Sequence, residues 1–132
     1  MDYDKKWLGL LAPLPANEGE CTRRVLHDAP FEDWVEVRVV LGNGVTGLRI
    51  ATAIFDADDR PGSVSDLVAT EGGRHQETVG GRVAANGRIQ GTYWLTENDQ
   101  SLSWPLSETE EQGLHTVAAA LRERYQPQRR DK

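Results

Sequence analysis

A histidine and a glutamate two residues apart, His75 and Glu77, are the pair in this sequence best suited to proton transfer. Side chains two residues apart point to one face of a β-strand, and an imidazole beside a carboxylate can serve acid–base chemistry. No nucleophile motif of the GxSxG kind and no nucleotide-binding glycine motif accompanies them. A small hydrolase or isomerase using His75 and Glu77 is therefore a hypothesis that rests on this pair alone.

The sequence predicts no metal site and no cofactor. Its three histidines are scattered, at His27, His75 and His115. The segment at 56–63 resembles the start of a calcium loop, but Arg60, Pro61 and Leu67 stand where an oxygen ligand, a glycine and a glutamate are needed. The single cysteine, Cys21, cannot form an intramolecular disulfide, and we expect it to be an inert small side chain.

The segment "GGRVAANGRIQGTYWL" at 80–95 combines a turn signal with aromatic rings and glycines. Asn86 followed by Gly87 predicts a two-residue type I′ hairpin, which would place Val83 opposite Gln90. Each face of this hairpin would then carry a glycine beside an aromatic ring.

Two interpretations of this hairpin remain open. In the structural one, the glycines curve the strand and let rings lie over bare backbone. In the functional one, a concave sheet face binds a small apolar or aromatic ligand without catalysis. The residues predicted to line that site are Trp94, Tyr93, Arg82, Gln90, Thr92 and Trp104.

The alternative to ligand binding, placed ahead of the enzyme hypothesis, is a protein-interaction or homo-oligomerising module without chemistry. In "WVEVRVVL" at 34–41, Trp34 falls on the face opposite the valines that would enter the core. It shares that face with Glu36, Arg38 and Val40, so the face is expected to be partly solvated. Exposed aromatic residues often mark contact surfaces, so we expect a partner or a second copy on the Trp34 face.

The pattern of the whole chain predicts an α+β fold: a curved antiparallel meander of five or six strands with a C-terminal amphipathic helix on one face. The helix is expected over about 108–125, opened by a capping box of Ser107 and Glu110 and ended by Pro127. A barrel-like or helix-grip-like arrangement is one form of this fold. In outline it resembles calycin-like barrels and helix-grip ligand carriers, a resemblance that implies nothing about a site.

One domain is expected over 1–126. It comprises an N-terminal arm at 1–33 with a short helix over Lys5–Leu11, a sheet at 34–105, a helix at 107–125 and a disordered tail at 127–132. Within the arm, "TRRVLH" at 22–27 could form a short strand. The segment at 64–70 fits either a strand or a helix, and its position between strands favours a strand.

Composition limits the classes of partner. The chain has 132 residues, 38% of them hydrophobic, which is enough for one core without metals or disulfides. A net charge of −6 argues against nucleic-acid binding, which normally needs a basic surface. The apolar run from Trp7 to Ala12 is too short to span a membrane or to act as a signal peptide. A cytoplasmic protein without membrane contact is therefore expected.

Overall fold

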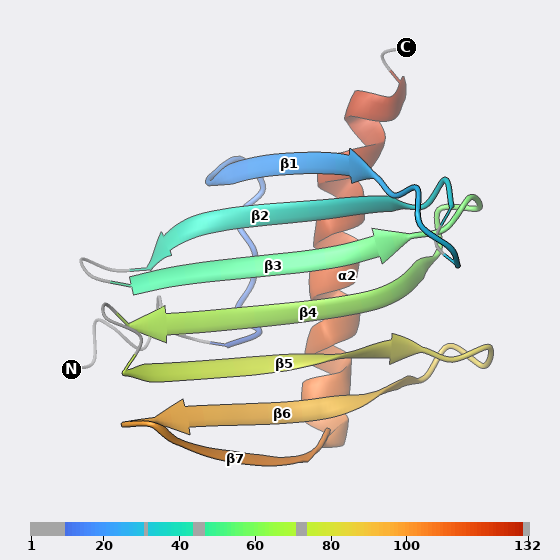
Figure 1. The fold of residues 1–132 in the computed structure, drawn as a ribbon. Helices are drawn as coiled ribbons and strands as arrows, with labels where there is room; N and C mark the ends of the chain where they lie inside the picture. Colours follow the sequence, from blue (N-terminus) through green and yellow to red (C-terminus); the bar gives the residue numbers. More distant parts are fainter. Residues whose placement is uncertain (1–9, 31, 44–46, 71–73, 131–132) are drawn as a thin grey trace.

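The chain forms one seven-stranded antiparallel sheet with a long helix packed across it (Figure 1). The computed structural model describes residues 10–30, 32–43, 47–70 and 74–130. The elements are β1 (Glu20–Val25), β2 (Val35–Asn43), β3 (Gly47–Phe55), β4 (Pro61–Thr70), β5 (His75–Val83), β6 (Ile89–Glu97), β7 (Gln100–Pro105) and α2 (Glu108–Arg130). Every strand pairs with the next one along the chain, so the sheet is a meander.

This architecture confirms the predicted α+β fold, with two corrections. The sheet has seven strands rather than five or six, because both terminal segments, 20–25 and 100–105, pair along their whole length. The barrel-like form is wrong, because β1 and β7 lie at opposite ends of the sheet and do not pair with each other. The segment at 64–70 belongs to β4, as its position between strands indicated.

The core lies between α2 and one face of the sheet. Val37, Val39 and Phe55 are fully buried there, as strand alternation predicted for the valines. Ala51 and Ala53 are buried on the same face, and their small side chains let the helix approach the sheet closely. The helix contributes a continuous buried stripe, which consists of Leu114, Val117, Ala118, Leu121 and Tyr125.

Helix α2 begins at the capping box that the sequence predicted. The Ser107 hydroxyl accepts a hydrogen bond from the Glu110 backbone N–H at 3.1 Å, and the Glu110 carboxylate accepts one from the Ser107 N–H at 2.8 Å. The helix continues to Arg130, beyond Pro127, where we expected it to end.

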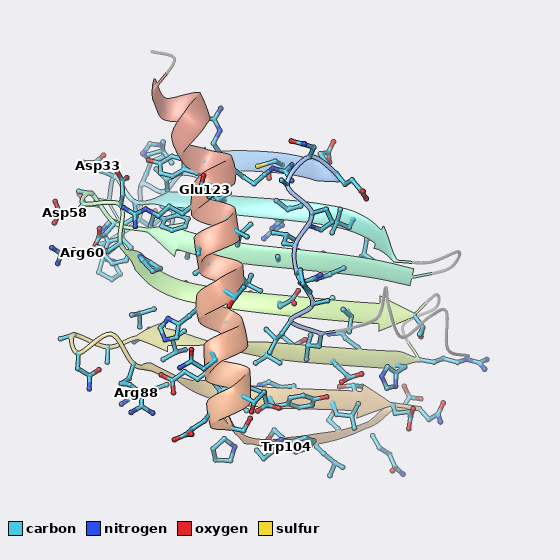
Figure 2. All side chains as sticks on the ribbon, turned by 180° about the vertical axis from the view of Figure 1, so that it is seen from behind. Asp33, Asp58, Arg60, Arg88, Trp104 and Glu123 are labelled. Carbon is cyan, nitrogen blue, oxygen red and sulfur yellow. The ribbon has the colours of Figure 1, made fainter. Side chains whose placement is uncertain are left out.

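The N-terminal arm, residues 10–19, crosses the sheet beside α2 and on the same face (Figure 2). Leu11 packs against Gly113 of the helix, where an added Cβ would lie 2.7 Å from the leucine side chain. The Arg124 guanidinium donates hydrogen bonds to the carbonyls of Pro15 and Glu18, at 3.2 and 2.9 Å. The arm is therefore part of the core, whereas most of the predicted helix over Lys5–Leu11 lies outside the described residues.

The loop of the hairpin between β5 and β6 is one residue longer than the predicted two-residue turn. Ala84 N–H donates to the Arg88 carbonyl and Gly87 N–H to the Ala84 carbonyl, so the loop has three residues. Gly87 alone in this loop has a positive φ, 86°, as expected for a type I turn followed by a glycine bulge. Val83 therefore pairs with Ile89 instead of Gln90, and every side chain of β6 changes face relative to β5.

Candidate functional site

The six residues predicted to line one ligand site lie on opposite faces of the sheet. Tyr93 and Trp104 are paired across β6 and β7 and lie on the face that carries α2 and the arm. The other four lie on the opposite face, where Arg82 pairs with Gln90, Gly80 with Thr92 and Thr78 with Trp94. Tyr93 and Trp94 are consecutive residues of β6 and therefore lie on opposite faces in any register, so the six side chains cannot line a single pocket.

On the helix side, Tyr93 and Trp104 form an aromatic pair. Trp104 lies near the first turn of α2 (Figure 2). Their rings stack with centroids 4.6 Å apart and an interplanar angle of 12°. The Tyr93 hydroxyl donates a hydrogen bond to the Glu77 carboxylate, and burial together with this bond raises the pKa of Tyr93. Trp104 remains 41% exposed, so the pair offers one ring to solvent.

His75 and Glu77 do lie together, but a second carboxylate joins them. The His75 Nε2 atom lies 2.7 Å from Glu77 Oε2, and its Nδ1 atom lies 2.9 Å from Glu97 Oε2. Hydrogen bonds that His75 donates to Glu77 and then to Glu97 raise the pKa of His75, which favours the doubly protonated imidazolium. Both ring nitrogens are engaged, so this geometry favours a cross-strand ion pair over a general base that faces a substrate.

Metal binding has no support in the part of the chain that the structure describes, where no three histidine, cysteine, aspartate or glutamate side chains converge. Cys21 is half-buried on β1 and free of a disulfide. In the predicted partner surface, Trp34 packs over Gly62, where an added Cβ would lie 2.4 Å from the indole ring.

A buried ion pair that sequence reasoning missed joins β3, β4 and the arm. The Arg49 guanidinium donates to both oxygens of Asp66, at 3.0 and 2.9 Å, and both side chains are buried. Leu11 N–H donates to Asp66 Oδ2 at 2.7 Å, and Arg49 donates to the Ala12 carbonyl at 2.7 Å. Burial raises the pKa of Asp66, and the bonds from Arg49 oppose that rise. The groups of this pair bond to one another and to the arm backbone, so the pair holds the arm to β3 and β4.

The first turn of α2 is fixed to the β5–β6 hairpin by Glu111. Its carboxylate accepts hydrogen bonds from Arg88 Nε at 2.8 Å, Arg88 Nη2 at 3.0 Å and Ile89 N–H at 2.8 Å. The bonds from Arg88 and then from Ile89 lower the pKa of Glu111 to about 2. The ionised carboxylate therefore orients the helix on the sheet.

We expect Glu111→Gln to lower the free energy of unfolding at pH 7 and to weaken its acid dependence. A folded-state pKa below the ordinary value of 4.5 contributes stability that is present above pH 4.5 and is lost as the pH falls toward 2. The gap between wild type and variant should therefore narrow from pH 5 to pH 3, measured by urea unfolding. Glu123→Gln, an exposed carboxylate on the same helix, is the control. A gap that stays constant over this range would contradict the prediction.

The sheet face opposite α2, here the helix-free face, carries apolar side chains near its middle, interspersed with Thr52, Ser65 and Thr78, and charged side chains toward β1 and at the end of β5. In the view of Figure 1 the helix and the arm lie behind the sheet, and within the described residues no element lies in front of it. The apolar side chains of this face are Val40, Leu48, Ile50, Ile54, Leu67, Ala69 and Trp94. Trp94 is 50% exposed and Leu48 39%. Arg24 and Arg38 lie 3.3 and 3.9 Å from Glu36 toward the β1 side, and Arg82 lies toward the other side.

The hollows of the described surface do not coincide with this face. The largest of the hollows described, about 640 Å³, lies at the β6–β7 turn and is lined by Leu95, Glu97, Asn98, Gln100, Ser101 and Leu102. None of the hollows described is lined by Trp94, Arg82, Gln90 or Thr92. The helix-free face is therefore an open surface, and a pocket for a small apolar or aromatic ligand stays a prediction.

No family model, curated protein or solved structure matches this chain. In the described residues, no helix is both long enough and apolar enough to cross a membrane.

Proposed function

We propose that this protein is a non-catalytic interaction module that dimerises through its helix-free face. The main observation behind the proposal is that the two faces of the sheet are covered unequally. One face is covered by α2 and the arm, whereas on the other no described element covers Trp94, Leu48, Ile50 or Leu67. Exposed apolar patches of this kind commonly mark interfaces between proteins.

The helix-free face has the size that a stable interface needs. Strands of nine residues at about 3.3 Å per residue, spaced about 4.8 Å apart, make a seven-stranded face roughly 30 Å on each side. Such a face offers about 800 Å² of area, which is what each partner contributes to a standard protein–protein interface. A small-molecule site would instead need a concave pocket that encloses its ligand.

The distribution of side chains across this face also fits an interface. Ile50, Ile54 and Leu67 lie on β3 and β4, the charged Arg24, Glu36 and Arg38 lie on β1 and β2, and Arg82 lies near the hairpin end of β5. An apolar centre surrounded by polar residues is the usual anatomy of a protein interface. Two copies that stack these faces about 10 Å apart would form a β-sandwich, with each α2 on the outside.

Leu67→Glu tests this interface. We expect wild type to sediment at about twice the chain mass of 14.7 kDa and Leu67→Glu to sediment as a folded monomer. A charge at the apolar centre would be buried without a partner in the dimer but solvated in the monomer. Leu102→Glu, the same change on the other face of the sheet at β7, is the control and should remain dimeric. Two results would contradict the proposal. One is a wild type that stays monomeric at about 100 µM, well above a dissociation constant of about 1 µM. The other is a monomeric Leu102→Glu.

Trp94→Ala separates a contact role from a core role. Because Trp94 is 50% exposed, its removal should change the free energy of unfolding of the monomeric Leu67→Glu protein by less than about 1 kcal/mol. In the otherwise wild-type chain it should weaken dimerisation about tenfold or more, since a tryptophan at an interface is a frequent energetic centre. Denaturant unfolding and sedimentation measure the two effects. A loss of about 3–5 kcal/mol in the monomer would instead identify a buried core ring.

A further inference from the structure

The two edges of the sheet differ in how well they are protected from pairing with another strand. The β1 edge carries three charged residues, Glu20, Arg23 and Arg24, in its six positions. The β7 edge, Gln100–Pro105, carries none, although all six of its residues are exposed. Charged side chains and proline are common ways to block edge-to-edge pairing, so β7 is protected only at its end, by Pro105, and is open at Ser101 and Ser103.

The backbone of β7 presents its open hydrogen-bonding groups at two serines. Leu106 N–H donates to the Gly91 carbonyl at 3.3 Å, which makes these two residues a hydrogen-bonded pair. Because such pairs alternate along an antiparallel ladder, Trp104 and Leu102 also direct their backbone groups toward β6. The N–H and C=O groups of Ser101 and Ser103 therefore point outward.

The side chains beside this edge favour a bound strand that has an apolar residue at every second position. Leu102 is 64% exposed and Trp104 41%, and both lie on the helix side of the sheet. The hollow of about 640 Å³ begins at Leu95 and Leu102. A strand added next to β7 would place every second side chain on this apolar surface and would place the others beside the small serines.

Carboxylates lie beyond both ends of the open edge. Glu97 and Asp99 belong to the β6–β7 turn, and Glu108 and Glu110 begin α2 directly after β7. A second copy paired antiparallel about Leu102 would bring its own Asp99 turn toward this helix start, where like charges repel. A strand with basic residues at both ends would be attracted instead.

We propose that the β7 edge binds an extended segment of a partner protein by strand addition, and that this segment has alternating apolar residues flanked by lysine or arginine. Backbone bonds to Ser101 and Ser103 supply the pairing, and Leu102 with Trp104 selects the apolar side chains. This surface is separate from the helix-free face. Binding is therefore expected in the Leu67→Glu monomer as well as in wild type, which keeps the two proposals distinguishable.

The test uses an eight-residue peptide of alternating valine and threonine between terminal lysines, titrated while tryptophan fluorescence is recorded. Ser103→Pro removes one outward N–H without removing a bond to β6, and we expect it to weaken binding at least tenfold. Ser103→Ala keeps the backbone donor and is the matched control, expected to bind like wild type. A peptide with glutamate in place of lysine should bind at least tenfold more weakly.

A second measurement does not depend on how the variants fold. Methylation of alternate peptide nitrogens blocks the outward or the inward set of N–H groups, so one methylated peptide should lose binding and the other should keep it. In NMR hydrogen exchange, the peptide should protect the amides of Ser101 and Ser103. Equal binding by Ser103→Pro and Ser103→Ala, equal binding by the two methylated peptides, or dimers of the chain joined at β7 would overturn the proposal.

Discussion

Asp66→Ala is expected to lower the free energy of unfolding by about 3–5 kcal/mol, the cost of breaking a buried ion pair by removing one partner. The loss has two sources. Arg49, which is 4% exposed, would lose the carboxylate that it binds, and the Leu11 N–H would lose its acceptor. Because Leu11 belongs to the arm, the substitution should also loosen the arm from the sheet. Denaturant unfolding followed by circular dichroism measures the first effect, and hydrogen exchange of the Leu11 amide measures the second.

Two further variants determine whether burial of the charge is the cause. Arg24→Ala breaks the exposed pair between Arg24 and Glu36 and should cost no more than about 1 kcal/mol. Replacing both partners, Arg49→Met with Asp66→Leu, should recover much of the loss, because no unpaired charge then remains buried. If Asp66→Ala costs as little as Arg24→Ala, the pair does not have the role assigned to it.

Gly91→Ala is expected to cost more than about 3 kcal/mol, above the usual penalty of about 1–3 kcal/mol for an overpacked site. An added Cβ would lie 1.9 Å from the Gly80 carbonyl oxygen and 2.5 Å from the Gly81 Cα, and both are backbone atoms that cannot rotate away. Relief of the clash would require β5 and β6 to separate, at the expense of their ladder. Urea unfolding gives the magnitude.

Gly42→Ala is the matched control. It makes the same substitution in another strand of the sheet, at a position where an added Cβ would meet no atom within 4 Å. It should change the free energy of unfolding by less than about 1 kcal/mol. Similar losses in the two variants would mean that the close approach of β5 and β6 does not restrict Gly91.

The elements of the fold could be predicted because their signals are periodic and redundant. The valines of β2 and the stripe of α2 each repeat over several residues, so one ambiguous position cannot change the prediction. The β5–β6 register depended on Asn86 and Gly87 alone, and a glycine with positive φ serves both a two-residue and a three-residue loop. The hydrophobic pattern could not decide between them, because Tyr93 and Trp94 put an aromatic ring on each face of β6.

The candidate site was less predictable because it depends on contacts between distant segments. Arg49 lies two residues before Ala51, and Asp66 lies two residues from both Val64 and Val68. Residues two apart share one face of a strand, so strand periodicity could have identified both charged side chains as core-facing. Their pairing across β3 and β4, and the contact with Leu11, needed the three-dimensional arrangement of the arm. The contact between Glu97 and His75 also depends on the pairing of β5 with β6, which spacing along the chain does not reveal.

The meander topology separates the folding of this protein into local and distant steps. Each strand pairs with its neighbour in sequence, so successive hairpins can form while the chain is being synthesised. The valines of β2 become buried only when Leu114 to Tyr125 have emerged and packed against them. Arg124 can then donate its hydrogen bond to the carbonyl of Pro15, 109 positions earlier in the chain. A nascent chain therefore exposes the apolar side chains of the face that α2 covers until α2 has emerged, and this interval is when it most needs protection from aggregation.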